Sequence, residues 1–136
     1  GRLYIVFCSS FLGFFSVLIY SITIKGFMIF EKKPYFGLME MLAKNKDDVT
    51  MFVILFLLGC LLGYMFSKNW LLTGFSILII FPINTLVEVA LNIGSHNLFP
   101  FEIAIYLYMS FFTIGGAFIG RSVRQVKDRK KKETSE

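Results

Sequence analysis

Four long stretches of the chain contain no Asp, Glu, Lys or Arg. They cover residues 3–24, 51–67, 70–87 and 103–120 of the 136-residue sequence. A soluble helical domain needs charged residues along every helix to cover its outer surface. A helix that crosses the hydrocarbon core of a bilayer needs about 20 mostly apolar residues. The sequence therefore predicts an all-α integral membrane protein.

The overall composition agrees with this prediction. Apolar residues make up 56% of the chain and the mean hydropathy is +0.69, whereas soluble domains are about 45–50% apolar. Cys8 and Cys60 lie inside apolar stretches, so we expect small buried side chains and no disulfide framework. A single histidine and no Cys or His pair at ligand spacing predict that the chain holds no metal and no cofactor.

The predicted transmembrane domain covers residues 1–120 and contains four helices. Their expected bounds are residues 3–24, 50–67, 70–92 and 101–120. The second and third helices are joined only by Lys68 and Asn69, so we expect an antiparallel hairpin there. The connection between the third and fourth is also short. These connections predict an up-down-up-down four-helix bundle.

The one substantial loop, residues 25–49, carries charges of both signs. In its middle, Phe36, Met39 and Leu42 follow near-helical spacing after Pro34, which suggests a short helix lying in the membrane interface. An irregular loop with a few apolar anchors explains the same residues equally well.

The residues from 121 to 136 form a basic tail, expected to be flexible, with seven Lys or Arg against three Asp or Glu. Directly after an apolar segment, such a tail indicates a cytoplasmic flank near anionic lipid headgroups rather than a nucleic-acid-binding segment. Four crossings then place both termini in the cytoplasm of a multi-pass cell-membrane protein, and residues 25–49 outside. The five lysines of that loop argue for the opposite orientation.

Small residues recur on one face of each predicted helix. Helices in lipid associate through close backbone approach at such residues. The glycines expected to pack are Gly13, Gly59, Gly63, Gly116 and Gly120. Helix packing is the first interpretation of these faces, and a substrate path is the alternative.

The third predicted helix contains polar groups at membrane depth. Pro82 is expected to kink it and leave a backbone carbonyl free near the middle of the membrane. Asn84 and Glu88 lie one turn apart beyond the proline. An ionisable residue inside a membrane is a candidate functional group, although Glu88 could instead be hydrated near the outer surface.

The turn Ser-His-Asn-Leu-Phe-Pro-Phe-Glu, residues 95–102, follows this helix. His96, Asn97 and Glu102 could converge with Glu88 on a proton-linked or divalent-cation site. A capped helix start with no ligand accounts for the same residues, because Pro100 and Glu102 both suit a first turn.

This turn, with the preceding proline-containing helix and the final segment Gly-Ala-Phe-Ile-Gly-Arg, resembles a group of small uncharacterised bacterial four-helix membrane proteins. Their turn has the form Asp-Pro-Thr-Ser-His-Asn-Leu-Trp-Pro-Phe-Glu. Here Asn92, Ile93 and Gly94 replace its first three residues, and Phe99 replaces the tryptophan. The resemblance covers the last third of the chain. It implies the fold and a bacterial inner membrane location, and it supplies no activity.

Three classes of function fit these observations. The first is a structural or accessory subunit that packs against a larger membrane protein. The second is a small transporter or channel for a proton, cation or small solute, formed by one chain or a homodimer and using Asn84, Glu88 and His96. An intramembrane enzyme has least support, because we recognise no catalytic motif in the sequence.

Overall fold

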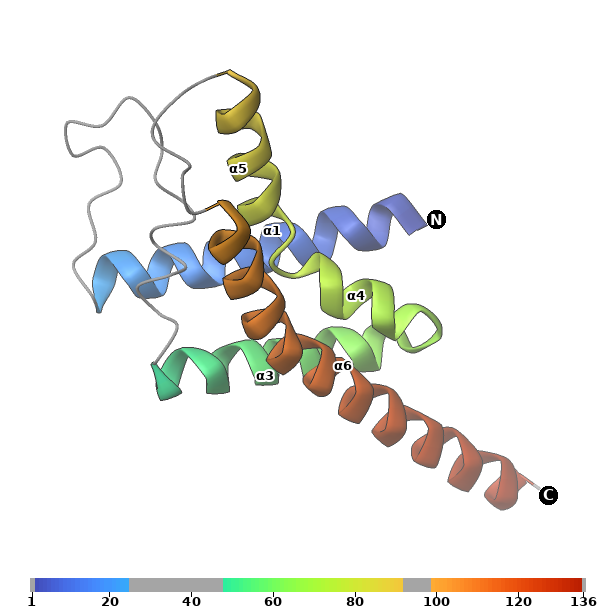
Figure 1. The fold of residues 1–136 in the computed structure, drawn as a ribbon. Helices are drawn as coiled ribbons and strands as arrows, with labels where there is room; N and C mark the ends of the chain where they lie inside the picture. Colours follow the sequence, from blue (N-terminus) through green and yellow to red (C-terminus); the bar gives the residue numbers. More distant parts are fainter. Residues whose placement is uncertain (1, 25–47, 92–98, 136) are drawn as a thin grey trace.

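The computed structural model describes residues 2–24, 48–91 and 99–135, and these ranges contain helices and turns but no β-strand. The elements are α1 (Arg2–Thr23), α3 (Val49–Met65), the short 3-10 helix η1 (Ser67–Asn69), α4 (Trp70–Ser76), α5 (Ile80–Ala90) and α6 (Phe99–Ser135), and Figure 1 labels the α-helices. The expected all-α class is confirmed. The interfacial helix expected within residues 25–49 lies outside the described ranges.

Two helices, α1 and α6, are long and apolar enough to cross a membrane. A third crossing is added if α3 and the following helical segment Ser67–Ser76 are counted as one span. These two segments are bent by 117° relative to each other. With 11 residues, α5 is shorter than a span. The four-helix count therefore stays a prediction.

Two contacts hold α1 and α3 side by side in opposite directions. At one end, the rings of Tyr4 and Phe66 lie 6.3 Å apart. At the other end, the Tyr20 hydroxyl donates to Asp48 Oδ2 at 2.7 Å. Asp48 is also the N-cap of α3, because its Oδ1 accepts from the backbone N–H of Thr50 at 2.9 Å and of Met51 at 3.3 Å.

The third expected helix, residues 70–92, is two helices in the structure. The chain breaks at residues 77–79, between α4 and α5, and turns sharply there (Figure 1). The break precedes Pro82, which lies in the first turn of α5, where a missing backbone N–H is tolerated. The expected free carbonyl is absent, because Leu78 O accepts from the Phe81 N–H at 3.2 Å.

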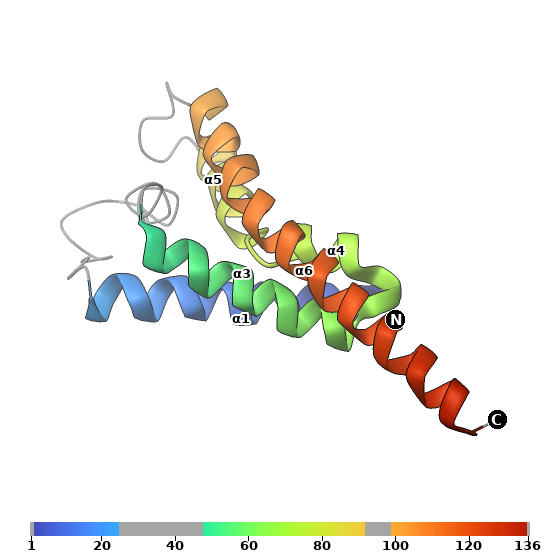
Figure 2. The ribbon, with the colours of Figure 1, turned by 90° about the horizontal axis from the view of Figure 1, so that it is seen from below.

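The basic tail is helical, and its expected flexibility stays a prediction. α6 does not end at Gly120 but continues as one helix of 37 residues to Ser135, and its end projects from the rest of the molecule (Figure 2). The reason lies in the sequence. After Gly120 the tail contains neither glycine nor proline and is rich in the helix formers Arg, Lys, Gln and Glu.

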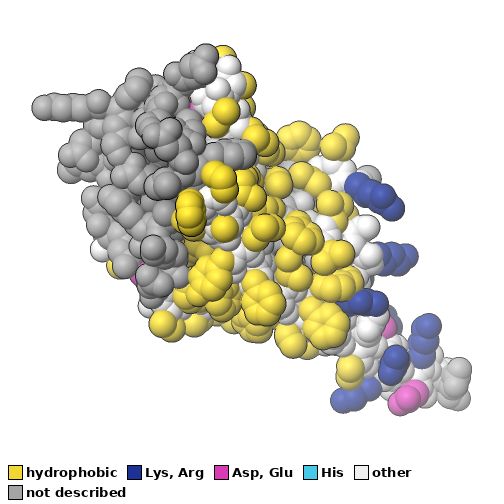
Figure 3. Space-filling view, in the orientation of Figure 1, with side chains coloured by type: hydrophobic (Ala, Val, Ile, Leu, Met, Phe, Trp, Pro, Cys, Tyr) yellow, Lys and Arg dark blue, Asp and Glu magenta, His cyan; other side chains and the backbone are white. Residues whose placement is uncertain are grey.

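The surface of the helical body is mostly apolar. Large side chains such as Phe7, Leu57 and Phe111 are exposed, with Phe111 at 75%, and Figure 3 shows apolar side chains covering the middle of the molecule. Lys and Arg gather at one end of this band. We call it the basic end, and it is formed by the start of α1, the turn at η1 and α6 from Arg121 onward.

Candidate functional site

The polar pair on α5 is hydrogen-bonded. Asn84 Nδ2 donates to Glu88 Oε1 at 2.9 Å, across one helical turn. The Glu88 side chain is buried, with 6% of its surface exposed. It shares the buried face of α5 with Phe81, Pro82 and Thr85, and α5 packs against α1 and α6. The structure therefore places a buried carboxyl group beside an amide donor within an apolar segment, where an ionisable residue is a candidate functional group.

Of the other residues of the predicted site, only Glu102 lies within the described ranges. His96 and Asn97 lie outside the described residues. Glu102 is half-buried in the first turn of α6, where it suits the helix N-terminus. The convergence of these groups on Glu88 thus stays a prediction. Within the described ranges, no three His, Cys, Asp or Glu side chains are grouped closely enough to hold a metal ion.

The glycines of α3 and α6 lie directly against each other. A Cβ atom added to Gly59 would overlap Thr113 O, and one added to Gly63 would overlap Ala117 O. From the other side, Gly116 meets Phe56 O and Gly120 meets Cys60 O. Successive contacts move along both helices in the same direction, so α3 and α6 are parallel. They make the most extensive contact between any two elements of the described structure.

Gly13 serves a different contact. A Cβ atom at this position of α1 would overlap Ile77 O, and Ile77 lies in the break between α4 and α5. The absence of a side chain at Gly13 thus lets α1 pass directly over the bend.

Hydroxyl groups of α6 satisfy the backbone where α4 ends. Because the helix stops, the carbonyls of Gly74 and Phe75 lose their usual partners one turn later. Thr113 Oγ1 donates to Gly74 O at 2.7 Å and also lies 2.8 Å from Ser110 O. The Tyr106 hydroxyl donates to Phe75 O at 2.8 Å. These bonds supply donors to carbonyls that the end of α4 leaves without helical partners.

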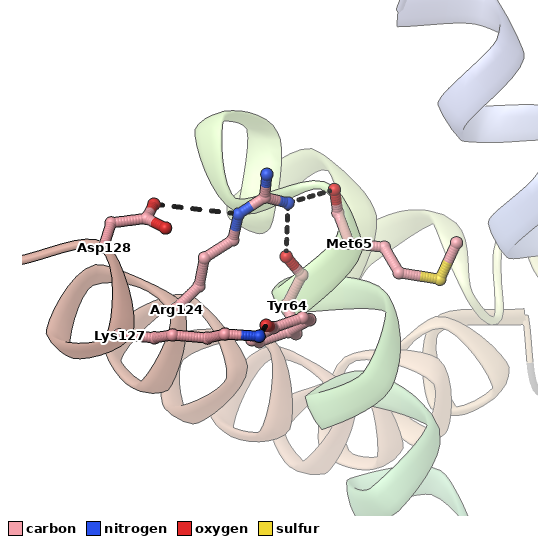
Figure 4. A network of polar contacts seen from close by, with 5 residues as sticks. All are labelled: Tyr64, Met65, Arg124, Lys127 and Asp128. Atoms are coloured by element: carbon pink, nitrogen blue, oxygen red, sulfur yellow. Dashed lines mark hydrogen bonds and ion pairs between the residues drawn. The ribbon is translucent and has the colours of Figure 1, made fainter. Parts of the chain in front are cut away.

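At the basic end, Arg124 of α6 binds the end of α3 (Figure 4). Its Nη1 donates to Tyr64 O at 2.9 Å and to Met65 O at 3.0 Å. These carbonyls belong to the last turn of α3, where a cation is electrostatically favourable. Asp128 Oδ2 lies 3.9 Å from Arg124 Nε, one turn further along α6. The guanidinium therefore links the two helices beyond the last glycine.

Aromatic rings complete this end of the molecule. Lys127 Nζ donates to the Tyr64 hydroxyl at 3.0 Å, and this bond raises the pKa of Lys127 above its ordinary value. The Arg121 guanidinium lies 5.5 Å from the centre of the Trp70 ring, a cation–π distance. Basic and aromatic side chains together are typical of the boundary between lipid and water.

Sequence reasoning missed the roles of Arg124, Tyr64 and Trp70. One signal was present, since Arg124 follows Gly116 and Gly120 at the same spacing of four residues and so continues their face of α6. No comparable pattern marks Tyr64 or Trp70, because their partners on α6 depend on how α3 and α4 pack against that helix.

The fold and these contacts define an all-helical protein with two helices able to span a membrane by length and composition. Comparisons with protein-family models, with curated proteins and with solved structures give no significant match.

Proposed function

We propose that the chain is an integral membrane protein that acts as a non-catalytic accessory subunit of a larger membrane assembly. The observation that supports this proposal is that α6 has two different halves within one continuous helix. Its apolar half packs through glycines against α3, and its basic half continues as the same helix away from the body. The helix thus joins a membrane-embedded part to a charged arm.

The basic arm, residues 125–135, has its side chains exposed along its whole length. A helix that is polar on all sides usually bridges to something else or depends on pairs of opposite charges. A flexible tether would suffice for general attraction to anionic lipid. A helix whose root is anchored by Arg124 holds its cations in a fixed pattern, which favours an acidic protein surface as the partner.

Native electrophoresis of membranes extracted in mild detergent tests this proposal. We expect the wild-type chain to migrate within a larger complex, and the triple variant Lys130→Glu, Lys131→Glu, Lys132→Glu to migrate alone. The matched control replaces the same three lysines by arginine, keeps the charge and should stay in the complex. A wild-type chain that migrates by itself in every mild detergent refutes an accessory role.

The buried Glu88 side chain, with Asn84 as its donor, favours a second candidate, a small proton-linked transporter. Protein reconstituted in vesicles with a pH-sensitive dye should then conduct protons, and Glu88→Gln should abolish the flux. Asp128→Asn removes an exposed carboxylate of the basic end and should leave it intact. Wild-type vesicles that behave like empty ones eliminate this candidate.

A further inference from the structure

A pocket of about 230 Å³ opens at the basic end, where the start of α1, the end of α3, the turn at η1 and α6 meet. This volume is several times what one water molecule needs. The pocket lies apart from the Asn84–Glu88 pair, and the accessory role proposed above does not depend on it.

Part of the pocket lining is polar and positively charged. It includes the cationic residues Lys68 and Arg124 and the neutral polar residues Ser67 and Asn69. Lys68 is exposed and has no carboxylate partner among the described residues. Arg124 uses Nη1 for the carbonyls of α3 and Nε for Asp128, so Nη2 keeps its donors (Figure 4). Two cations with available N–H donors suit a phosphate group.

The rest of the pocket lining is apolar. It is formed by Ile5, Met65 and Phe66, of which Met65 is 53% exposed at the surface of the helical body. A freely soluble phosphate compound gains nothing from such a lining. A molecule with a charged head and a hydrocarbon chain can use both the cationic and the apolar residues of this lining.

We propose that this pocket binds the phosphate headgroup of an anionic glycerophospholipid, with Lys68 and Arg124 holding the phosphate and Met65 and Phe66 against the start of the acyl chains. Basic pockets between helices at a membrane surface recognise such headgroups. The basic arm attracts anionic membranes without a defined site, whereas this pocket holds one lipid molecule.

The chain contains a single tryptophan, Trp70, next to the pocket residue Asn69, and its fluorescence reports binding. The full chain in mild detergent is titrated with dioctanoyl phosphatidylglycerol, dioctanoyl phosphatidylcholine or glycerol 3-phosphate. We expect saturable binding of phosphatidylglycerol and much weaker binding of the other two. Lys68→Gln should weaken binding of phosphatidylglycerol about five-fold, the effect of one cation near a headgroup.

The matched control is Lys130→Gln, which removes the same charge from the basic arm and should leave the affinity unchanged. Both lysines are exposed, so neither variant disturbs the fold. Equal weakening by the two variants would show general electrostatic attraction and overturn the proposal. Equal affinity for phosphatidylcholine would overturn it as well. Glycerol 3-phosphate binding as tightly as phosphatidylglycerol would mean that the pocket takes a soluble phosphate compound.

Discussion

At Gly116 the backbones of α3 and α6 approach too closely for any side chain. We predict that Gly116→Ala destabilises the protein by about 1–3 kcal/mol, the usual cost of forcing extra atoms into a packed contact. The adjacent Gly115 has open space where a Cβ would stand. Gly115→Ala should therefore be neutral, or stabilise by up to about 1 kcal/mol through helix propensity.

Reversible unfolding in mixed micelles measures both glycine variants. Equal effects at residues 115 and 116 would contradict the close contact between α3 and α6.

Thr113 tests the hydrogen bonds at the helix break. Thr113→Val keeps the side-chain shape and removes the donor to Gly74 O, so we predict a loss of about 0.6–2 kcal/mol, typical of a polar contact between helices in membranes. Thr23→Val is the control, because Thr23 Oγ1 bonds only the carbonyl of Ile19 in its own helix and is exposed. The same unfolding assay compares the two, and a larger loss at Thr23 would argue against this role of Thr113.

Among the elements, the break between α4 and α5 is the least expected. Pro82 prevents residue 82 from donating to Leu78 O, so we predict that Pro82→Ala lets the chain straighten there. Spin labels at residues 71 and 87, both exposed, measure the result in a background without Cys8 and Cys60. The interlabel distance should lengthen towards about 24 Å, the rise of a continuous helix. An unchanged distance would mean that packing against Gly13 and α6 sets the bend.

The sequence predicted α1, α3 and the apolar half of α6 well and the segment of α4 and α5 less well. Apolar length alone located α1, α3 and the apolar half of α6, because in each case a run of uncharged residues coincides with one helix. It could not locate the break at residues 77–79. The residues that complete the break, Gly13, Tyr106 and Thr113, come from other helices, and local patterns contain no information on them.

The candidate site was predictable to a similar degree. Glu88 and Asn84 were found from their spacing within an apolar segment, since an isolated carboxylate there is conspicuous. The pocket at the basic end was not, because its lining joins residues from α1, α3, η1 and α6.

For the whole molecule, the structure places the start of α1, the turn at η1 and the basic arm at the same end. We predict that single cysteines at residues 68 and 130, in a cysteine-free background, react with a membrane-impermeant maleimide only after the cells are opened. A cysteine at residue 33 should react on intact cells, since residues 25–49 are expected outside. If only one of the cysteines at residues 68 and 130 is labelled on intact cells, the two positions do not lie at the same end of the molecule. If both are labelled on intact cells and the cysteine at residue 33 is not, the orientation in the membrane is the opposite of the expected one.

The parallel contact of α3 and α6 has a mechanical consequence. Interlocked backbones cannot slide past one another without a clash, and Arg124 fastens the pair just before the helix leaves the body. We therefore expect a tilt of the basic arm to move α3 together with α6. A partner that binds the arm would then displace α3 and α6 as one unit.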